Sequence, residues 1–336
     1  MEGAAKLAAV GAVRGITLDI NRSVQNALSS RLSDSTNLFD PARGSSTILN
    51  GDSSGQNITF WMTPLYQTEH TWNKNSGSYS TGYKGDFAGM IAGLETSASK
   101  NLRFGGAVNI GTGNADSRGD FRHTRNDFDF WGVNLYGKWK HDNLDLNAHL
   151  GYLQNRSELK QSLPSGMNMS ELKSRVTAHS FTAGIEAAYK IKSDYIDVKP
   201  HIGLTYNRLS SNSYRIRSDD ETIFNGKDRH QNIWSIPLGL QLSKTYRAVN
   251  NWNIKPVLDA TVTYSTGDRD VHSQIEVPSL TQEADLTTDV VDKVMLGGNM
   301  GVEISRKDMA FGFKYQIQSS TNRTGQAVYA FFRKSF

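Results

Sequence analysis

The sequence has no cysteine in its 336 residues, so disulfide bridges and thiolate metal sites are excluded. Long hydrophobic runs are also missing. Hydrophobic residues make up 37% of the chain, mean hydropathy is -0.50, and no stretch approaches the roughly 20 apolar residues that a membrane-spanning helix needs. A helical membrane protein is therefore excluded. A transmembrane β-barrel is not, because only every second residue of its strands faces lipid.

Charge of one sign is not in large excess either. The 37 basic and 33 acidic residues leave a net charge of +4, which is too small to predict a nucleic-acid partner. His149 and His201 lack the spacing of metal ligands and have no accompanying ligand set. We therefore expect no metal, no other cofactor and no enzyme activity.

The first 34 residues are rich in alanine and contain no proline, which predicts one long helix over residues 1–34. Its apolar positions do not form a single stripe, and its charges are spread around it, as expected for a helix within a mixed polar surface. The opening residues resemble a secretory signal, but Arg14 interrupts the apolar run. We expect a mature fragment whose signal lies outside this sequence. Residues 35–56, rich in Ser and Gly, are predicted to be a linker.

From residue 57 to residue 336 the sequence alternates with period two, in segments longer than ordinary soluble strands. In the clearest segment Trp131, Val133 and Leu135 alternate with Asn134 and Lys138. Twelve such segments can be counted, an even number, as in bacterial outer-membrane barrels. They start near residues 57, 85, 100, 126, 142, 175, 194, 231, 251, 289, 308 and 325. The predicted fold is all-β, a 12-stranded antiparallel transmembrane β-barrel over residues 57–336.

Short and long connections alternate along the barrel segments. Tight turns are predicted at 99–101, 141–143, 192–194, 248–251 and 306–308. Long polar loops are predicted at 70–84, 112–126, 155–174, 210–230 and 266–288. Outer-membrane barrels have short turns on the periplasmic side and long loops outside, so we expect a bacterial outer-membrane location with the loops at the cell surface. A soluble sandwich or a lipocalin-like barrel, the other architectures with one apolar strand face, has no reason to keep this rule.

The face opposite the apolar one carries charges and glycines and is predicted to line a wet lumen. We expect the helix to lie inside this lumen, with the glycines leaving room for it or helping the barrel to curve. The candidate lumen and helix-contact residues are Glu95, Arg103, Lys138, Asp145, Glu186, Lys199, Lys255, Asp259, Glu303 and Lys314.

The helix segment Gln25–Leu32, the linker, the twelve-segment pattern and the C-terminal aromatic together resemble the autotransporter β-domain (type V secretion translocator) family. Segments 184–189, 198–204 and 252–256 resemble strands of that family as well. The resemblance implies a barrel with a helix in its pore that anchors an N-terminal passenger and exports it to the cell surface. It also implies contacts with outer-membrane lipid and lipopolysaccharide, with the barrel assembly machinery, and with the protein's own passenger domain, which lies outside this sequence.

Two further sites follow from the resemblance. The last strand of the family carries an assembly signal, to which Val328, Ala330, Phe332 and Phe336 correspond, although Lys334 departs from the pattern. Some members cut themselves in the pore helix by cyclisation of an asparagine. The matching residue here is Asn26, but it lacks the paired asparagine of the self-cleaving group. We therefore expect Asn26 to be an ordinary polar residue of the helix. A porin-like channel or a surface adhesin barrel plugged by its N-terminal segment is the open alternative.

Overall fold

The structure is a computed structural model, and it describes residues 2–33, 58–76, 79–119, 123–162, 171–218, 221–226, 230–277 and 280–336. A single long helix, α1 (Glu2–Ser33), precedes an antiparallel sheet, whereas the predicted linker at 35–56 lies outside the described residues. Among the described residues no helix has the length and apolar character required to cross a membrane.

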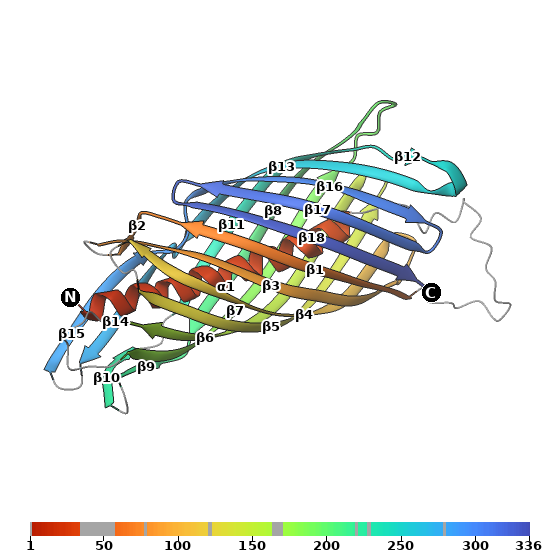
Figure 1. Ribbon diagram of the computed structural model, residues 1–336. Coiled ribbons are helices and arrows are strands. Elements are labelled where there is room, and N and C mark those ends of the chain that lie inside the picture. The colour runs from red at the N-terminus through yellow and green to blue at the C-terminus, as the bar shows by residue number, and fades with distance from the viewer. Residues whose placement is uncertain are drawn as a thin grey trace.

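Twelve long strands form the barrel wall, as the alternating pattern predicts. Each pairs antiparallel with the next along the chain, and β1 pairs with β18 to close the barrel. Figure 1 shows α1 running inside the wall. The wall strands are β1 (Ile58–Thr71), β3 (Tyr79–Ser97), β4 (Leu102–Gly119), β5 (Thr124–His141), β6 (Leu144–Gln161), β7 (Leu172–Tyr189), β8 (Asp197–Ser211), β11 (His230–Ser243), β13 (Asn253–Gly267), β16 (Val294–Arg306), β17 (Met309–Ser320) and β18 (Arg323–Ser335).

The two faces of the wall differ as the sequence predicts. On β5, Trp131, Val133 and Leu135 are exposed on the outside, while Asn134 and Lys138 are buried on the inside. Because strand side chains alternate between faces, each wall strand gives an apolar outer face to lipid and a mainly polar inner face to the lumen. This outward apolar band is what a transmembrane barrel requires.

One end of the barrel has short connections. The turn between β5 and β6 is tight, with Asp142 at φ 50°, and the turn between β16 and β17 has Lys307 at φ 49°. Both values lie in the left-handed region that tight hairpin turns use. The turn between β11 and β13 is longer and holds a short strand β12 (Tyr246–Arg247) and a 3-10 helix, η2 (Val249–Asn251). This end is the predicted periplasmic rim.

At the other end the predicted long loops are wrong in large part, because much of their length is strand. The short strands there are β2 (Lys74–Ser76), β9 (Tyr214–Ser218), β10 (Glu221–Gly226), β14 (Asp270–Val277) and β15 (Leu280–Asp289). They join β3 and β7 in one sequence of pairings, β3-β2-β15-β14-β10-β9-β7. Polarity indicated exposure to water, but strands beyond the membrane still pair through their backbones. We call this extension of the wall the collar.

The lumen glycines hold inward aromatic rings against the wall. A Cβ at Gly93 would lie 2.7 Å from the Trp61 ring, and one at Gly312 would lie 2.0 Å from the Phe331 ring. Strand glycines often mark such close approaches. The nearest atoms to these two glycines therefore belong to adjacent strands and not to the helix. Because these glycines have no Cβ, the two rings can lie close to the wall, which leaves room in the lumen for α1.

α1 has a main apolar stripe that was not predicted from the sequence, because charged residues are spread around the helix. Ile16, Ile20, Val24 and Leu28 follow a four-residue spacing and are buried. They belong to one cluster with inward rings and aliphatic side chains of β1, β3 and β5, among them Trp61. Residues four apart lie on one helix face, so this side packs on an apolar part of the wall. Val13 and Leu18 lie outside this stripe and pack in two smaller apolar clusters with other parts of the wall. The other described side chains of the helix face mainly polar wall.

Candidate functional site: the lumen and its helix

From Arg14 to Leu32, the polar sides of α1 are matched by polar side chains of the wall. Near the collar, the Arg14 guanidinium donates a hydrogen bond to Ser211 Oγ at 2.8 Å. One turn further on, Asn155 Nδ2 donates to Thr17 Oγ1 at 3.0 Å. All four residues are buried, so these bonds satisfy groups that would otherwise be desolvated without a partner.

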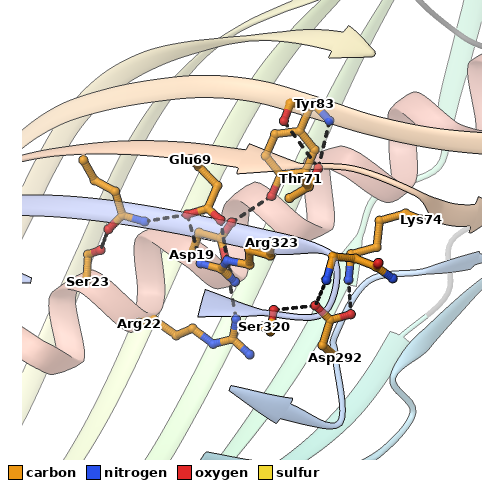
Figure 2. Close-up of polar contacts among 12 residues, drawn as sticks. Asp19, Arg22, Ser23, Glu69, Thr71, Lys74, Tyr83, Asp292, Ser320 and Arg323 are labelled. Atoms are coloured by element: carbon orange, nitrogen blue, oxygen red, sulfur yellow. Dashed lines mark hydrogen bonds and ion pairs between the residues drawn. The ribbon is translucent and has the colours of Figure 1, made fainter. Parts of the chain in front are cut away.

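An ion-pair cluster joins α1 to the seam where the barrel closes (Figure 2). Arg323 on β18 lies between two carboxylates: its Nη1 is 2.5 Å from Asp19 Oδ1 on α1, and its Nη2 donates to Glu69 Oε2 on β1 at 3.1 Å. The Tyr83 hydroxyl donates to Asp19 Oδ2 at 2.8 Å, and Arg22 lies 3.6 Å from Asp19. Charges buried this deeply are stable only when paired, so the cluster fixes the helix to three strands, β1, β3 and β18.

On the opposite side, Asn21 holds the helix to β7 and β8. Its Nδ2 is 2.9 Å from both Ser180 Oγ and Asn207 Oδ1, and it also contacts Thr182 Oγ1. A little further along, Gln25 Nε2 donates to Asn207 Oδ1 at 3.3 Å. Together with the ion-pair cluster, these bonds hold the helix from opposite parts of the wall.

The C-terminal end of α1 is held near the periplasmic rim. Arg31 forms a buried ion pair with Glu95, which also lies 3.6 Å from Arg103. The Lys138 ammonium donates to the Leu32 carbonyl at 2.6 Å, where the last carbonyls of a helix lack partners within the helix. Cations are favoured at a helix C-terminus, so Lys138 both caps the helix and complements its dipole.

The predicted lumen residues lie on the inner face. Three of them contact α1 directly: Glu95, Lys138 and Lys314, whose ammonium donates to Ser30 Oγ at 2.5 Å. Asp145 acts through Lys138, with Nζ–Oδ2 at 2.9 Å, and receives Lys199 at 2.8 Å.

A cavity of about 230 Å³ lies beside the helix. Glu186, Lys199, Asp259, Glu303 and Lys314 are among its lining residues. Lys255 is buried and pairs in register with Glu303. Several of the predicted residues therefore border unfilled space beside the helix, and Lys314 both lines this space and contacts the helix.

Sequence reasoning missed the residues that tie the helix to the seam: Arg323, Glu69 and Tyr83. Tyr83 fell within a segment predicted to be a loop, and Arg323 precedes the predicted start of the last strand. A usable signal was present. Arg323 has the same parity as the buried residues Tyr329 and Arg333, so extending the alternation by one step would have put it in the lumen.

The two histidines and Asn26 are close to the cavity. His201 Nε2 is 2.9 Å from Asp259 Oδ2, whereas His149 lies against Gly184. Asn26 is partly buried and lines the cavity, and its carbonyl accepts a hydrogen bond from Ser30 Oγ at 2.6 Å. The latter bond is an ordinary helix contact between residues four apart.

The last strand closes the barrel. Val328, Ala330 and Phe332 alternate with the buried lumen residues, so they lie on the outer face. Phe336 follows β18, is 73% exposed, and donates its backbone N–H to the Ile58 carbonyl at 2.9 Å. Lys334 also faces outward, and its ammonium lies 5.4 Å from the centre of the Phe336 ring.

Solved structures with a similar fold include two transport domains of autotransporters. The translocator domain of the autotransporter NalP from Neisseria meningitidis superposes with a TM-score of 0.64 at 10% identity, covering 95% of this chain and 98% of that one. The transport unit of the autotransporter AIDA-I from Escherichia coli gives a TM-score of 0.59 at 12% identity, with 93% and 98% covered. These likenesses concern the fold.

The model of the autotransporter β-domain family matches residues 60–316. This chain belongs to the autotransporter β-domain family. It is an outer-membrane β-barrel of the translocator type, which serves a passenger. Family members are transport domains.

Two curated relatives match part of this chain. The IgA-specific serine endopeptidase autotransporter of Neisseria gonorrhoeae is 24% identical over 169 residues, which is 50% of this chain and 10% of that protein. Outer membrane protein B of Rickettsia rickettsii is 25% identical over 138 residues, 38% of this chain and 8% of that protein. This chain thus spans a tenth or less of the length of these relatives.

Proposed function

We propose that this autotransporter domain carries the polypeptide joined to the N-terminal end of α1 across the outer membrane, and that α1 then remains in the lumen as its plug. The observation that carries the proposal is the polar match between helix and wall described above. A helix merely passing through would not need bonds to β1, β3, β5, β6, β7, β8, β17 and β18. Arg14 near the collar and Arg31 near the periplasmic rim give the helix its direction, so a segment attached before α1 would emerge outside.

Deleting residues 1–34 tests the plug. Without the helix the polar bore fills with water, so the refolded barrel should conduct ions in planar bilayers, while the full chain should stay closed. Both proteins must first show the shift in gel mobility on heating that is typical of folded barrels. Equal conductance of the two folded proteins would contradict the plug.

Transport is tested by display on intact cells. An epitope fused before Met1 should be cut by added protease on intact cells. The same epitope inserted in the tight turn at Asp142 should be cut only after the outer membrane is permeabilised. Protection of both epitopes on intact cells would count against export, whatever the bilayer recordings show.

We further propose that the domain has no enzyme activity and that Asn26 is a structural helix residue. Its carbonyl is already engaged by Ser30, and its place beside the cavity is explained by the polar lining. Mass spectrometry of purified outer membranes should find α1 continuous through Asn26. A species starting at Ala27 that disappears in an Asn26→Ala variant would show self-cleavage instead.

Assembly is the remaining part of the proposal. Val328, Ala330, Phe332 and Phe336 would be recognised by the barrel assembly machinery, and the exposed outer face would then contact lipid. The outward positions of the first three and the exposure of Phe336 support this role. Lys334 can extend its ammonium toward the membrane interface, so a charged residue is tolerated among the outward-facing residues of the last strand.

A further inference from the structure

The outer wall of the collar side carries a row of cations on four neighbouring strands. Arg125 on β5 stands opposite Lys160 on β6, Lys160 opposite Lys173 on β7, and Lys173 opposite Arg217 on β9. All four side chains are exposed. Directly opposed residues have Cβ atoms roughly 5 Å apart, and like charges in such pairs destabilise a sheet. Three consecutive pairs of this kind are unfavourable for the barrel alone.

Nearby carboxylates offset only part of this charge. Arg125 Nε lies 2.9 Å from Asp127 Oδ1, and Arg175 Nε lies 2.9 Å from Glu158 Oε1. Both pairs are exposed, so each contributes little. Lys160, in the middle of the row, has no carboxylate within ion-pair distance in the part of the chain that the structure describes.

The β7–β9 end of the row is similar. Lys173 has one exposed contact, with Glu171 at 3.5 Å. Arg215, one position along the same face of β9, and Arg217 are exposed and form no ion pair with the described residues. The chain continues from β9 into Asp219, which lies outside the described residues. Lys160 and Lys173 have a described cation opposite them on each side and are therefore the positions to substitute.

The height of the row above the membrane indicates which part of the outer leaflet surrounds it. The outward aromatic side chains Trp131 on β5 and Tyr152 on β6 mark the outer membrane interface, as such residues do in barrels. Arg125 lies six positions beyond Trp131, and Lys160 lies eight beyond Tyr152. At about 3.3 Å per residue and a tilt of about 40°, this is roughly 15–20 Å above the interface. At that height the sugars of the outer-leaflet glycolipid surround the barrel.

We propose that this cationic wall, defined as Arg125, Lys160, Lys173, Arg215 and Arg217, binds the phosphate groups on the inner sugars of lipopolysaccharide. Arginine offers a planar fork that fits phosphate oxygens, and lysine offers a point charge. Neighbouring cations about 5 Å apart can share one phosphate, which converts the repulsive pairs into a favourable site. The site lies outside the lumen and does not depend on passenger transport.

The test uses the full chain refolded in detergent micelles. Its probes are lipopolysaccharide with a phosphorylated inner core and the same lipopolysaccharide after chemical dephosphorylation. The variant is Lys160→Glu with Lys173→Glu. Its matched control is Lys100→Glu with Lys192→Glu, which makes the same charge change at exposed positions of the periplasmic rim. Dissociation constants are measured at two salt concentrations, and folding is checked by gel mobility.

We expect the dissociation constant to rise about tenfold or more for the variant with phosphorylated lipid and for the parent with dephosphorylated lipid, whereas that of the control stays within about twofold of the parent. Binding of phosphorylated lipid by the parent should also weaken when the salt concentration is raised. Without lipid, the variant should melt at the same or a higher temperature than the parent, because two of the three opposed pairs then join opposite charges and only the pair at positions 160 and 173 remains alike in charge. With phosphorylated lipid, only the parent and the control should gain stability. If the two lysines had a purely structural role, the order of melting temperatures of parent and variant would not change on adding lipid.

Three results would overturn the proposal: unchanged binding by the variant, equal binding of the dephosphorylated lipid, or displacement of the lipid by low concentrations of a soluble sulfated polysaccharide such as heparin. The last would identify a soluble anionic glycan as the occupant. If the double glutamate variant does not fold, Lys160→Gln with Lys173→Gln replaces it, with Lys100→Gln and Lys192→Gln as its control, and the same three results apply.

Discussion

Replacing Arg323 by methionine is expected to release α1 from the seam of the barrel. Methionine keeps much of the apolar stem but removes the charge that lies between Asp19 and Glu69. Two buried carboxylates then remain together, and among the described residues the cation left beside them is Arg22, 3.6 Å from Asp19. Removing one partner of a buried ion pair costs about 3–5 kcal/mol. At about 1.4 kcal/mol per factor of ten, the ratio of docked to undocked helix should fall roughly 140- to 4000-fold.

Single-channel recording measures this ratio as the fraction of time in which the lumen is closed. The parent should open rarely, and the Arg323→Met barrel should open often while still showing the gel mobility of a folded barrel. Arg125→Met is the matched control, because its ion pair with Asp127 is exposed to solvent and contributes little to stability. It should conduct like the parent.

A rescue variant separates charge from packing. Adding Asp19→Asn and Glu69→Gln to Arg323→Met removes the uncompensated carboxylates and should restore most of the closed time. The reasoning is refuted if the single variant stays as closed as the parent, or if the triple variant opens as often as the single one.

Three further outcomes are expected. Gly312→Ala should lower stability by about 1–3 kcal/mol in urea unfolding from lipid vesicles, because its Cβ meets the Phe331 ring at 2.0 Å, whereas Gly297→Ala, with a nearest atom at 3.7 Å, should be nearly neutral. Lys138→Met should speed amide hydrogen exchange about tenfold in the last turn of α1 only, since a charge-assisted hydrogen bond worth about 1.5–3 kcal/mol is lost there; exchange that rises along the whole helix would contradict this. Deleting Phe336 should slow assembly in cells but not refolding of purified protein into vesicles, and equal slowing in both would place its role in the barrel itself.

The barrel and its lumen face could be predicted from the sequence. The alternation of apolar and polar residues is visible within a single strand. Trp131, Val133 and Leu135 can therefore be assigned to the outer face without knowing which strand pairs with theirs. The tight turns were equally local. The collar was not predicted, because polar strands above a membrane and polar loops have similar compositions, and the pairing of β10 with β14 depends on closure of the whole barrel.

The sequence by itself determined that one face of each strand meets lipid, that charges gather on the other face, and that a long helix precedes the barrel. Only the tertiary structure decided which charges meet. Arg323 and Glu69 are 254 positions apart, and they become neighbours because β18 pairs with β1 in one register. Asp19 joins them only when the helix sits at one depth in the lumen. Contacts of this kind depend on closure, register and docking, which no local pattern of residues encodes.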